Sequence, residues 1–205
     1  MTLLSTAISA VLGIPLGLWL DRVRFPGKKL VVMINRTLMA TPPVVVGLVV
    51  FLALMRDGPF GFLGLIFTFE AMVIAQVLLI TPIICGMVYT ASSQHAQRIR
   101  LFAVTMGASK WQTQILLIRE LGNEIYFALV TGFGRAMSEV GAILIVGGNI
   151  RHHTRTMTTS ISMLRNMGEM DQAILLGAVL MMIAFGIQMV ASLIRKKERR
   201  TDENF

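Results

Sequence analysis

The feature that most constrains this chain is a series of five long apolar runs separated by short polar segments. An α-helix rises about 1.5 Å per residue, so about 20 apolar residues are needed to cross the hydrocarbon core of a bilayer. Each run has close to this length and contains few charged residues. The sequence therefore predicts an all-α, polytopic integral membrane protein whose five transmembrane helices lie at about residues 3–20, 31–55, 69–89, 125–146 and 173–194.

The composition agrees with a membrane protein and excludes an ordinary soluble domain. Hydrophobic residues make up 55% of the chain and charged residues 15%, and the mean hydropathy is +0.71. Soluble domains are much less apolar. A cleavable signal peptide is the other interpretation of the first run, but such a peptide begins with basic residues and none precedes this run.

The cationic residues are distributed unevenly among the segments between the runs. Thirteen of the 19 lysines and arginines fall in residues 22–29, 98–119 and 195–200, whereas four fall in the two other polar segments. Cytoplasmic segments are enriched in Lys and Arg, so we expect the N-terminus outside, with the central loop and a basic tail at 195–205 in the cytoplasm. The net charge of +8 follows from this topology and gives no reason to expect a nucleic-acid partner.

The second run contains Pro42 and Pro43, which cannot donate backbone hydrogen bonds. Prolines at membrane depth free backbone carbonyl groups, and they either kink a helix or break it beside a cavity. We favour a simple kink over a break that contacts substrate.

The central loop at residues 98–121 reads RIRLFAVTMGASKWQTQILLIREL and is basic and amphipathic. On each side of Gly107, apolar residues recur at spacings of three and four, as on one face of a helix. They are Ile99, Phe102, Ala103 and Met106 before the glycine, and Trp111, Ile115 and Ile118 after it. The pattern predicts two short helices joined at the glycine and lying at the cytoplasmic surface. An amphipathic helix bound to anionic lipid is the alternative interpretation.

This loop resembles the cytoplasmic EAA loop of ABC importer permeases, because Ala103 is followed after three residues by Gly107, Ala108 and Ser109. The match is partial, since Leu101 and Phe102 occupy the first two motif positions and no proline follows the loop. In that family the loop docks into a groove on the ATPase subunit. The resemblance therefore assigns ATPase coupling to Leu101, Phe102, Ala103, Gly107, Ala108, Ser109 and Trp111.

The resemblance extends over nearly the whole chain and points to the oxyanion branch of the type I, binding-protein-dependent importer permeases, especially the tungstate type. It rests on FPG at 25–27, TPPVVVGL at 41–48, GPFGFLG at 58–64 and GFGRAMSEVGAILIVGGNIRHHTRTMTTSI at 132–161. It implies a single transmembrane permease domain at 1–194, in the plasma (inner) membrane of a prokaryote. Relatives in the family carry further residues before the first helix, so we expect this chain to begin inside that helix.

Within the longest matching segment, Arg135 and Glu139 are four residues apart on one expected helix, so we expect them to share a face and to neutralise each other. Charged residues inside a membrane span are costly unless they pair or face protein or water. We therefore assign Arg135, Ser138 and Glu139 to the translocation path or to an intramembrane pair, and favour a structural clamp over direct contact with substrate. We expect the helix to end near Gly147.

The segment after this helix contains the donor-rich residues Asn149, Arg151, Thr154 and Arg155. A tetrahedral oxyanion needs such donors, and arginine fits best. In the resembled family a separate extracytoplasmic protein binds the anion, so we favour contact with that protein or with solvent over coordination of the anion. The neighbouring His152-His153 pair has no further ligands beside it in the sequence, and we assign no metal site.

No G-x-x-x-x-G-K-[ST], G-x-S-x-G or H-E-x-x-H motif occurs, so we expect a non-catalytic subunit that binds no cofactor itself. The resemblance implies an ATP-driven tungstate importer in which two copies of the chain form the path. Its partners are the bilayer, separate ATPase subunits that use ATP and magnesium, and an extracytoplasmic oxyanion-binding protein.

Molybdate or sulfate is the alternative substrate. An ATP-independent secondary transporter or channel is the alternative function, although five spans without an internal repeat argue against inverted-repeat transporters, and a membrane anchor is a weaker one.

Overall fold

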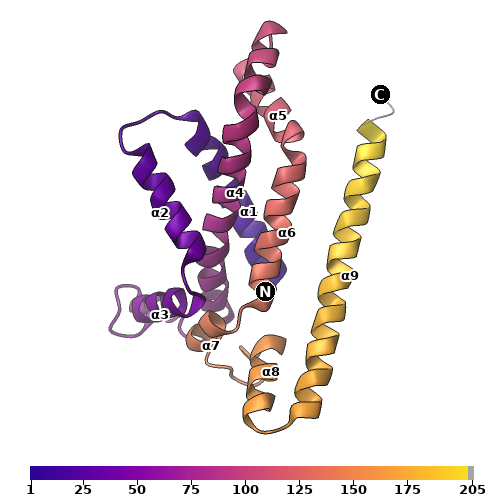
Figure 1. The fold of residues 1–205 in the computed structure, drawn as a ribbon. Coiled ribbons are helices and arrows are strands. Elements are labelled where there is room, and N and C mark those ends of the chain that lie inside the picture. The colour runs from indigo at the N-terminus through magenta and orange to yellow at the C-terminus, as the bar shows by residue number, and fades with distance from the viewer. Residues whose placement is uncertain (203–205) are drawn as a thin grey trace. The chain divides into compact units, whose positions relative to one another are not determined.

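The computed structural model describes residues 1–202, with side chains for residues 1–193, and every regular element in that part of the chain is helical (Figure 1). All side chains of the predicted basic tail at 195–205 thus lie outside the described residues, as does the backbone of 203–205. The chain divides into two compact units, Met1–Gly148 and a second that begins at Asn149. The elements are α1 (Thr2–Arg22), α2 (Lys28–Ala40), α3 (Pro43–Leu54), η1 (Gly61–Leu63), α4 (Phe69–Thr105), α5 (Lys110–Glu120), α6 (Gly122–Ser138), α7 (Gly141–Gly147), α8 (Met157–Asn166) and α9 (Met170–Asp202).

The lengths and hydropathy of these helices confirm the prediction of an all-α membrane protein. α1, α4 and residues Met170–Leu193 of α9 are each long and apolar enough to cross a bilayer. Two helix pairs, α2 with α3 and α6 with α7, pass the same test together and are bent by 101° and 57°. The described residues thus hold three candidate spans, or five if each bent pair forms one span.

α4 is the central helix of the first unit, and α1 packs along it through small residues. Ser5, Ser9, Gly13 and Gly17 recur every four residues, so they form one stripe on α1, and all four are buried. A Cβ atom on Gly17 would lie 2.7 Å from the carbonyl oxygen of Cys85, so only glycine permits this close approach. Small residues let membrane helices pack tightly where burial of apolar surface gives no driving force.

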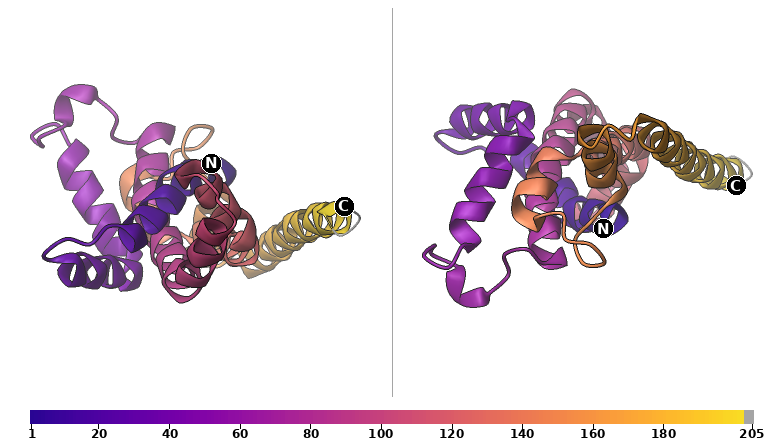
Figure 2. Two further views of the ribbon diagram at one scale, coloured as in Figure 1. Left: turned by 90° about the horizontal axis from the view of Figure 1, so that it is seen from above. Right: turned by 90° about the horizontal axis from the view of Figure 1, so that it is seen from below.

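The remaining helices of the first unit complete two apolar clusters. α6 packs against α1 and α4, and α7 packs against α3 and α4. Figure 2 shows α2 and α3 to one side of the group formed by α1, α4 and α6. One cluster joins α4, α5 and α6 and includes Ile80, Ile84, Val88, Leu117, Leu121 and Ala128. The other joins α3, α4 and α7 and includes Val50, Leu54, Ala75, Leu79, Ala142 and Val146.

The join between α2 and α3 is a break and not the simple kink that we expected. Thr41 and Pro42 are extended, with ψ angles of 131° each, and the chain turns by 101°. A proline disfavours helical geometry in the residue before it, and this acts twice in the sequence Thr41-Pro42-Pro43. Pro43 itself fits the first position of α3, because that position needs no intrahelical N–H donor.

The long helix α4 also differs from the expected layout. We expected a separate short helix at 98–106, but α4 runs without interruption for 37 residues to Thr105. No glycine or proline occurs between residues 90 and 105, so nothing in the local sequence ends the helix earlier. α5 then packs back against α4, so that the two helices form a hairpin at one end of the unit (Figure 1).

The second unit consists of a loop followed by α8 and α9, which pack against each other. Thr156 caps α8: its side chain accepts a hydrogen bond from the backbone N–H of Thr159, and the Thr159 hydroxyl accepts one from the N–H of Thr156. The turn into α9 contains Gly168, whose φ angle is +83°.

Candidate functional site

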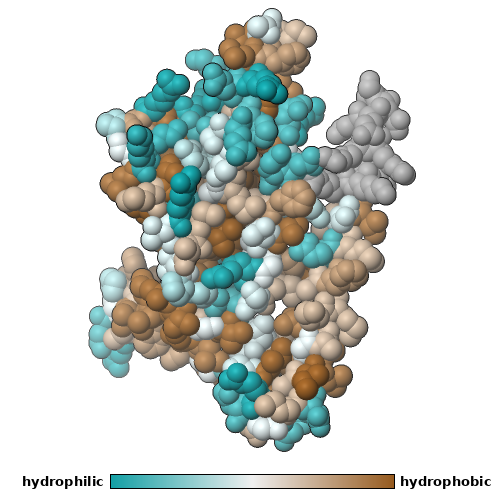
Figure 3. All heavy atoms as spheres, viewed as in Figure 1, coloured by the Kyte–Doolittle hydropathy of each residue, from teal (hydrophilic) through white to brown (hydrophobic). Residues whose placement is uncertain are grey.

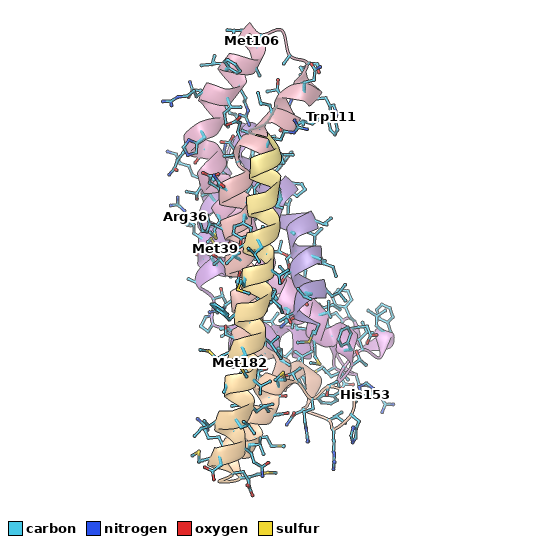
Figure 4. All side chains as sticks on the ribbon, turned by 90° about the vertical axis from the view of Figure 1, so that its right-hand side faces the viewer. Arg36, Met39, Met106, Trp111, His153 and Met182 are labelled. Carbon is cyan, nitrogen blue, oxygen red and sulfur yellow. The ribbon has the colours of Figure 1, made fainter. Side chains whose placement is uncertain are left out.

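The hairpin of α4 and α5 ends in a patch of exposed apolar side chains, here named the tip patch. Its members, which are between 58% and 74% exposed, are Leu101, Phe102, Val104, Met106 and Trp111. In Figure 4 Met106 lies at the tip and Trp111 projects from the start of α5, and in Figure 3 the tip is hydrophobic above a hydrophilic band. The tip patch lies beyond the predicted span at 69–89, and an exposed apolar patch of this kind is typical of a surface that binds a protein or the membrane surface.

Gly107 forms the turn of the hairpin. Its φ angle is +73°, which side chains with a Cβ atom disfavour. The N–H groups of Gly107 and Ala108 donate to the carbonyl oxygens three and five residues earlier, at 3.0 and 2.9 Å, which completes a Schellman turn at the end of α4. Ser109 then caps α5 in a reciprocal pair of hydrogen bonds with Gln112. The predicted helix–glycine–helix arrangement is therefore confirmed.

The apolar faces predicted for the two hairpin helices are only partly buried. Ala103 is the fully buried member of the first face, and α5 is buried through Thr113 and Leu117, which lie off the predicted stripe. α5 packs against α4, and Leu117 joins Ala96 in a buried cluster against which Ile99 also packs. The larger apolar residues of both stripes, Phe102 and Trp111 among them, therefore stay open to a partner.

A charged link joins the base of the hairpin to the end of α1. Nη2 of Arg100 lies 3.0 Å from Oδ2 of Asp21, and the Ser92 hydroxyl donates to the same oxygen at 3.0 Å. The Arg100 and Asp21 side chains are 29% and 12% exposed, so solvent screens the pair only in part. Sequence reasoning missed this link, because Asp21 and Arg100 are 79 residues apart.

The assigned intramembrane residues lie at the break between α6 and α7. Arg135 and Ser138 belong to the last turn of α6, but Glu139 follows the helix and is extended, so the two charged residues do not lie on one continuous helix. Oε1 of Glu139 accepts a hydrogen bond from the N–H of Ala142 at 2.8 Å. Glu139 is 4% exposed and thus caps α7 from a buried position. The predicted end of this region at Gly147 is confirmed.

A buried amide, which sequence reasoning did not assign to the site, holds the end of α6. Oε1 of Gln76 accepts a hydrogen bond from the Ser5 hydroxyl at 2.8 Å, and its Nε2 donates to the carbonyl oxygen of Ala136 at 3.0 Å. Carbonyl groups in the last turn of a helix lack intrahelical donors. Gln76 thus satisfies one of them and links α1, α4 and α6. The available signal was a lone amide in the apolar run at 69–89.

The donor-rich loop opens the second unit and is held by its own hydrogen bonds. The N–H of Ile150 donates to the Thr154 hydroxyl at 3.0 Å, and Nη2 of Arg155 lies 3.5 Å from the carbonyl oxygen of Asn149. Arg151 and Arg155 are exposed, as are the two histidines between them. Among the described residues, no group of three or more His, Cys, Asp or Glu side chains is placed to hold a metal ion. The loop therefore offers guanidinium donors to an anion or to an acidic protein surface.

Comparison with known proteins finds relatives that are named as permeases of transport systems. The tungstate uptake system permease TupB of Peptoclostridium acidaminophilum is 48% identical over 186 residues, which cover 91% of this chain and 82% of that protein. TupB of Campylobacter jejuni is 34% identical over 199 residues, or 95% of this chain and 83% of that protein. The molybdenum transport permease ModB of Azotobacter vinelandii is 30% identical over 166 residues, or 77% of this chain and 74% of that protein.

A family model also matches most of the chain. Residues 13–195 match the model described as a binding-protein-dependent transport system inner membrane component. The matched residues include the second half of α1, the later candidate spans, the hairpin and the donor-rich loop. The relatives above are named as permeases of transport systems, which agrees with this description. This chain therefore belongs to the family of binding-protein-dependent transport system inner membrane components.

Proposed function

We propose that this chain is the permease subunit of an ATP-driven importer for tungstate. The two relatives named as tungstate uptake permeases align with more of this chain, and at higher identity, than the molybdenum relative does. The anions that such proteins carry are tetrahedral oxyanions of similar size. Molybdate is therefore the natural competitor in any test of the substrate.

The exposed tip patch is the observation that carries the proposal. Large apolar and aromatic side chains concentrated in one patch are typical of binding hot spots, and here they stand on a hairpin fixed by a capped turn. We assign ATPase docking to this hairpin. In this assignment Leu101, Phe102 and Trp111 contact the ATPase, Gly107, Ala108 and Ser109 form the turn, and Ala103 packs the two helices together.

The remaining partners follow from topology and from the donor-rich loop. The hairpin and the C-terminus face the cytoplasm and the N-terminus faces outside, in agreement with the uneven distribution of cationic residues. The loop with Asn149, Arg151, Thr154 and Arg155 then faces the extracytoplasmic oxyanion-binding protein. Exposed guanidinium groups suit an acidic surface on that partner.

Two copies of the chain form the translocation path, and the break between α6 and α7 lies beside it. Broken helices at membrane depth are tolerated where protein or a cavity satisfies the freed backbone groups, and Arg135, Ser138 and Glu139 lie at this break. The chain itself is non-catalytic and binds no cofactor, because the partner ATPases bind ATP and magnesium. Docking of the loaded binding protein shifts the transporter between states only if it binds those states with different affinity.

Co-purification and uptake test this proposal together. A tagged chain expressed with its neighbouring genes should co-purify with a P-loop ATPase. Cells that express these genes should take up tungstate, and excess molybdate should reduce this uptake only weakly. The double variant Phe102→Ala, Trp111→Ala should lose the ATPase and the uptake while the chain stays in the membrane, because both side chains are exposed. Leu12→Ala, at an exposed apolar position on α1, is the control and should retain both. Tungstate uptake by the purified chain alone in vesicles would overturn the proposal.

A further inference from the structure

A cleft in the first unit lies between the turn after α1, the helix α2 and the middle of α4. Its volume is about 610 Å³. None of its lining residues, all within the described part of the chain, is acidic. Figure 3 shows hydrophilic residues gathered over this side of the molecule. We name it the cationic cleft, because four basic side chains line it: Arg24, Lys28, Lys29 and Arg36.

The carboxylate closest in sequence does not neutralise this charge. Oδ2 of Asp21 already accepts hydrogen bonds from Arg100 and Ser92, outside the cleft. Nζ of Lys28 donates to the backbone carbonyl oxygen of Asp21 at 2.9 Å and lies 5.6 Å from the centre of the Tyr89 ring. These contacts orient the Lys28 ammonium group without cancelling its charge. Arg36 also lines an adjoining cavity that contains Glu124, so the positive potential that favours an anion comes mainly from Arg24, Lys28 and Lys29.

The cleft lies where the chain leaves the membrane. α1 has 21 residues, a length of about 30 Å, so the turn that follows it lies at a membrane boundary. Arg36 lies eight residues after Lys28 on α2, or about 12 Å further along the helix, and its long side chain can extend toward the boundary. Figure 4 shows Arg36 on α2.

Part of the cleft wall is apolar. Phe25, Val32 and Met33 line it together with the basic residues. A free anion would leave these side chains in contact with water, whereas the glycerol and upper acyl chain of a lipid would cover them. Basic pockets beside membrane helices at the boundary are suited to anionic headgroups.

We propose that the cationic cleft binds a tetrahedral, phosphate-type oxyanion group, supplied by the headgroup of an anionic phospholipid. The basic side chains bind the phosphate oxygens, and the apolar wall covers the adjoining part of the lipid. This inference rests on the membrane placement of α1 and α2 and not on the ATPase or the transported anion. If the lipid site is disproved, the proposed transport function is unaffected. If the transport function is disproved, the lipid site is unaffected.

Lipid nanodiscs test the inference with the full chain and the subunits that purify with it. The melting temperature is measured in phosphatidylcholine alone and in equal parts of phosphatidylcholine and phosphatidylglycerol, and the phosphatidylglycerol retained per chain is measured by native mass spectrometry. Free phosphate and free tungstate are added to the phosphatidylcholine sample as separate arms. The test variant is Arg24→Gln, Lys29→Gln, since both residues are exposed. The control Arg56→Gln, Arg165→Gln removes two exposed cations outside the cleft.

We expect phosphatidylglycerol to raise the melting temperature of the wild type and of the control, and to be retained by both. The affinity of the test variant for phosphatidylglycerol should fall roughly tenfold or more, because each cation near an anionic headgroup contributes to binding. If free phosphate or tungstate reproduces the effect and phosphatidylglycerol does not, the cleft is an oxyanion site and the lipid assignment is overturned. If the test variant and the control respond alike to every anion, the site itself is overturned.

Discussion

Oδ2 of Asp21 and Nη2 of Arg100 are 3.0 Å apart, and this pair fixes the end of α1 to the part of α4 that leads into the hairpin. The Ser92 hydroxyl adds a second hydrogen bond to the same oxygen. The tip patch therefore stands on a base that is tied to the first span. Any displacement of the hairpin relative to α1 must break this pair or carry α1 with it.

Asp21→Asn should destabilise the chain by about 1–2 kcal/mol, because it leaves a partly buried guanidinium group without its counter-charge. Arg100→Gln should have a similar effect, and the double variant should be little worse than either single one, since both remove the same interaction. Thermal denaturation of the detergent-solubilised protein measures these changes. Asp57→Asn, at an exposed acid, is the control and should have no effect. Fully additive losses at the two positions would show that the pair is not coupled.

Gly107→Val should abolish ATPase co-purification and uptake without removing the chain from the membrane. A β-branched side chain at a φ angle of +73° costs about 1–2 kcal/mol, which the short turn can avoid only by changing shape. The tip patch would then lose its geometry. Gly134→Ala is the matched control, because a Cβ atom there meets no other atom within 4 Å. Normal uptake by the Gly107 variant would rule out this turn as the coupling element.

Glu139→Leu should be more harmful than Glu139→Gln, because the glutamine amide retains an oxygen that can accept from the N–H of Ala142. Loss of a helix cap costs about 1 kcal/mol, so the leucine variant should show a lower melting temperature and lower uptake. If the charge of Glu139 is what matters, the glutamine and leucine variants will be equally impaired. The ranking of the two variants by uptake and thermal denaturation thus separates capping from charge pairing.

Gln76→Leu should destabilise the chain by about 1–3 kcal/mol, because it leaves the buried carbonyl oxygen of Ala136 without its donor, whereas the Ser5 hydroxyl keeps the carbonyl oxygen of Met1, 3.2 Å away, as an acceptor. Adding Ser5→Ala should change the loss little, since the hydroxyl that it removes still has the carbonyl oxygen of Met1 as an acceptor. Ser93→Ala, at an exposed position on the same helix, should be close to neutral. Melting temperatures of the four proteins measure the effect. A large recovery in the double variant would show that the Ser5 hydroxyl depends on Gln76 alone.

The span-length helices could be predicted because membrane-crossing length and hydropathy are local properties of a sequence. The runs expected at 3–20 and 173–194 agree with α1 and with the apolar part of α9. The turn at Gly107 was predictable for the same reason, because a glycine readily adopts the positive φ angle that ends α4. The expected helix end near Gly147 is likewise set by adjacent glycines.

Contacts between distant segments could not be predicted in this way. The bonds of Gln76 to Ser5 and of Asp21 to Arg100 join residues 71 and 79 apart, and no local pattern encodes them. The spacing of Arg135 and Glu139 suggested one helical face, but the helix ends between them, and the carboxylate accepts a hydrogen bond at the start of the next helix. The roles assigned to the tip patch and to the donor-rich loop stay predictions, because they depend on partners.

The uninterrupted length of α4 has a mechanical consequence. Its 37 residues make a rod about 55 Å long, of which about 30 Å is needed to cross the hydrocarbon core. The other 25 Å or so acts as a lever arm whose fulcrum is the membrane boundary. A tilt of about 10° there displaces the free end by about 4 Å, by the same helix geometry. A small rotation inside the bilayer and a stroke of several ångströms outside it are thus linked through one continuous helix.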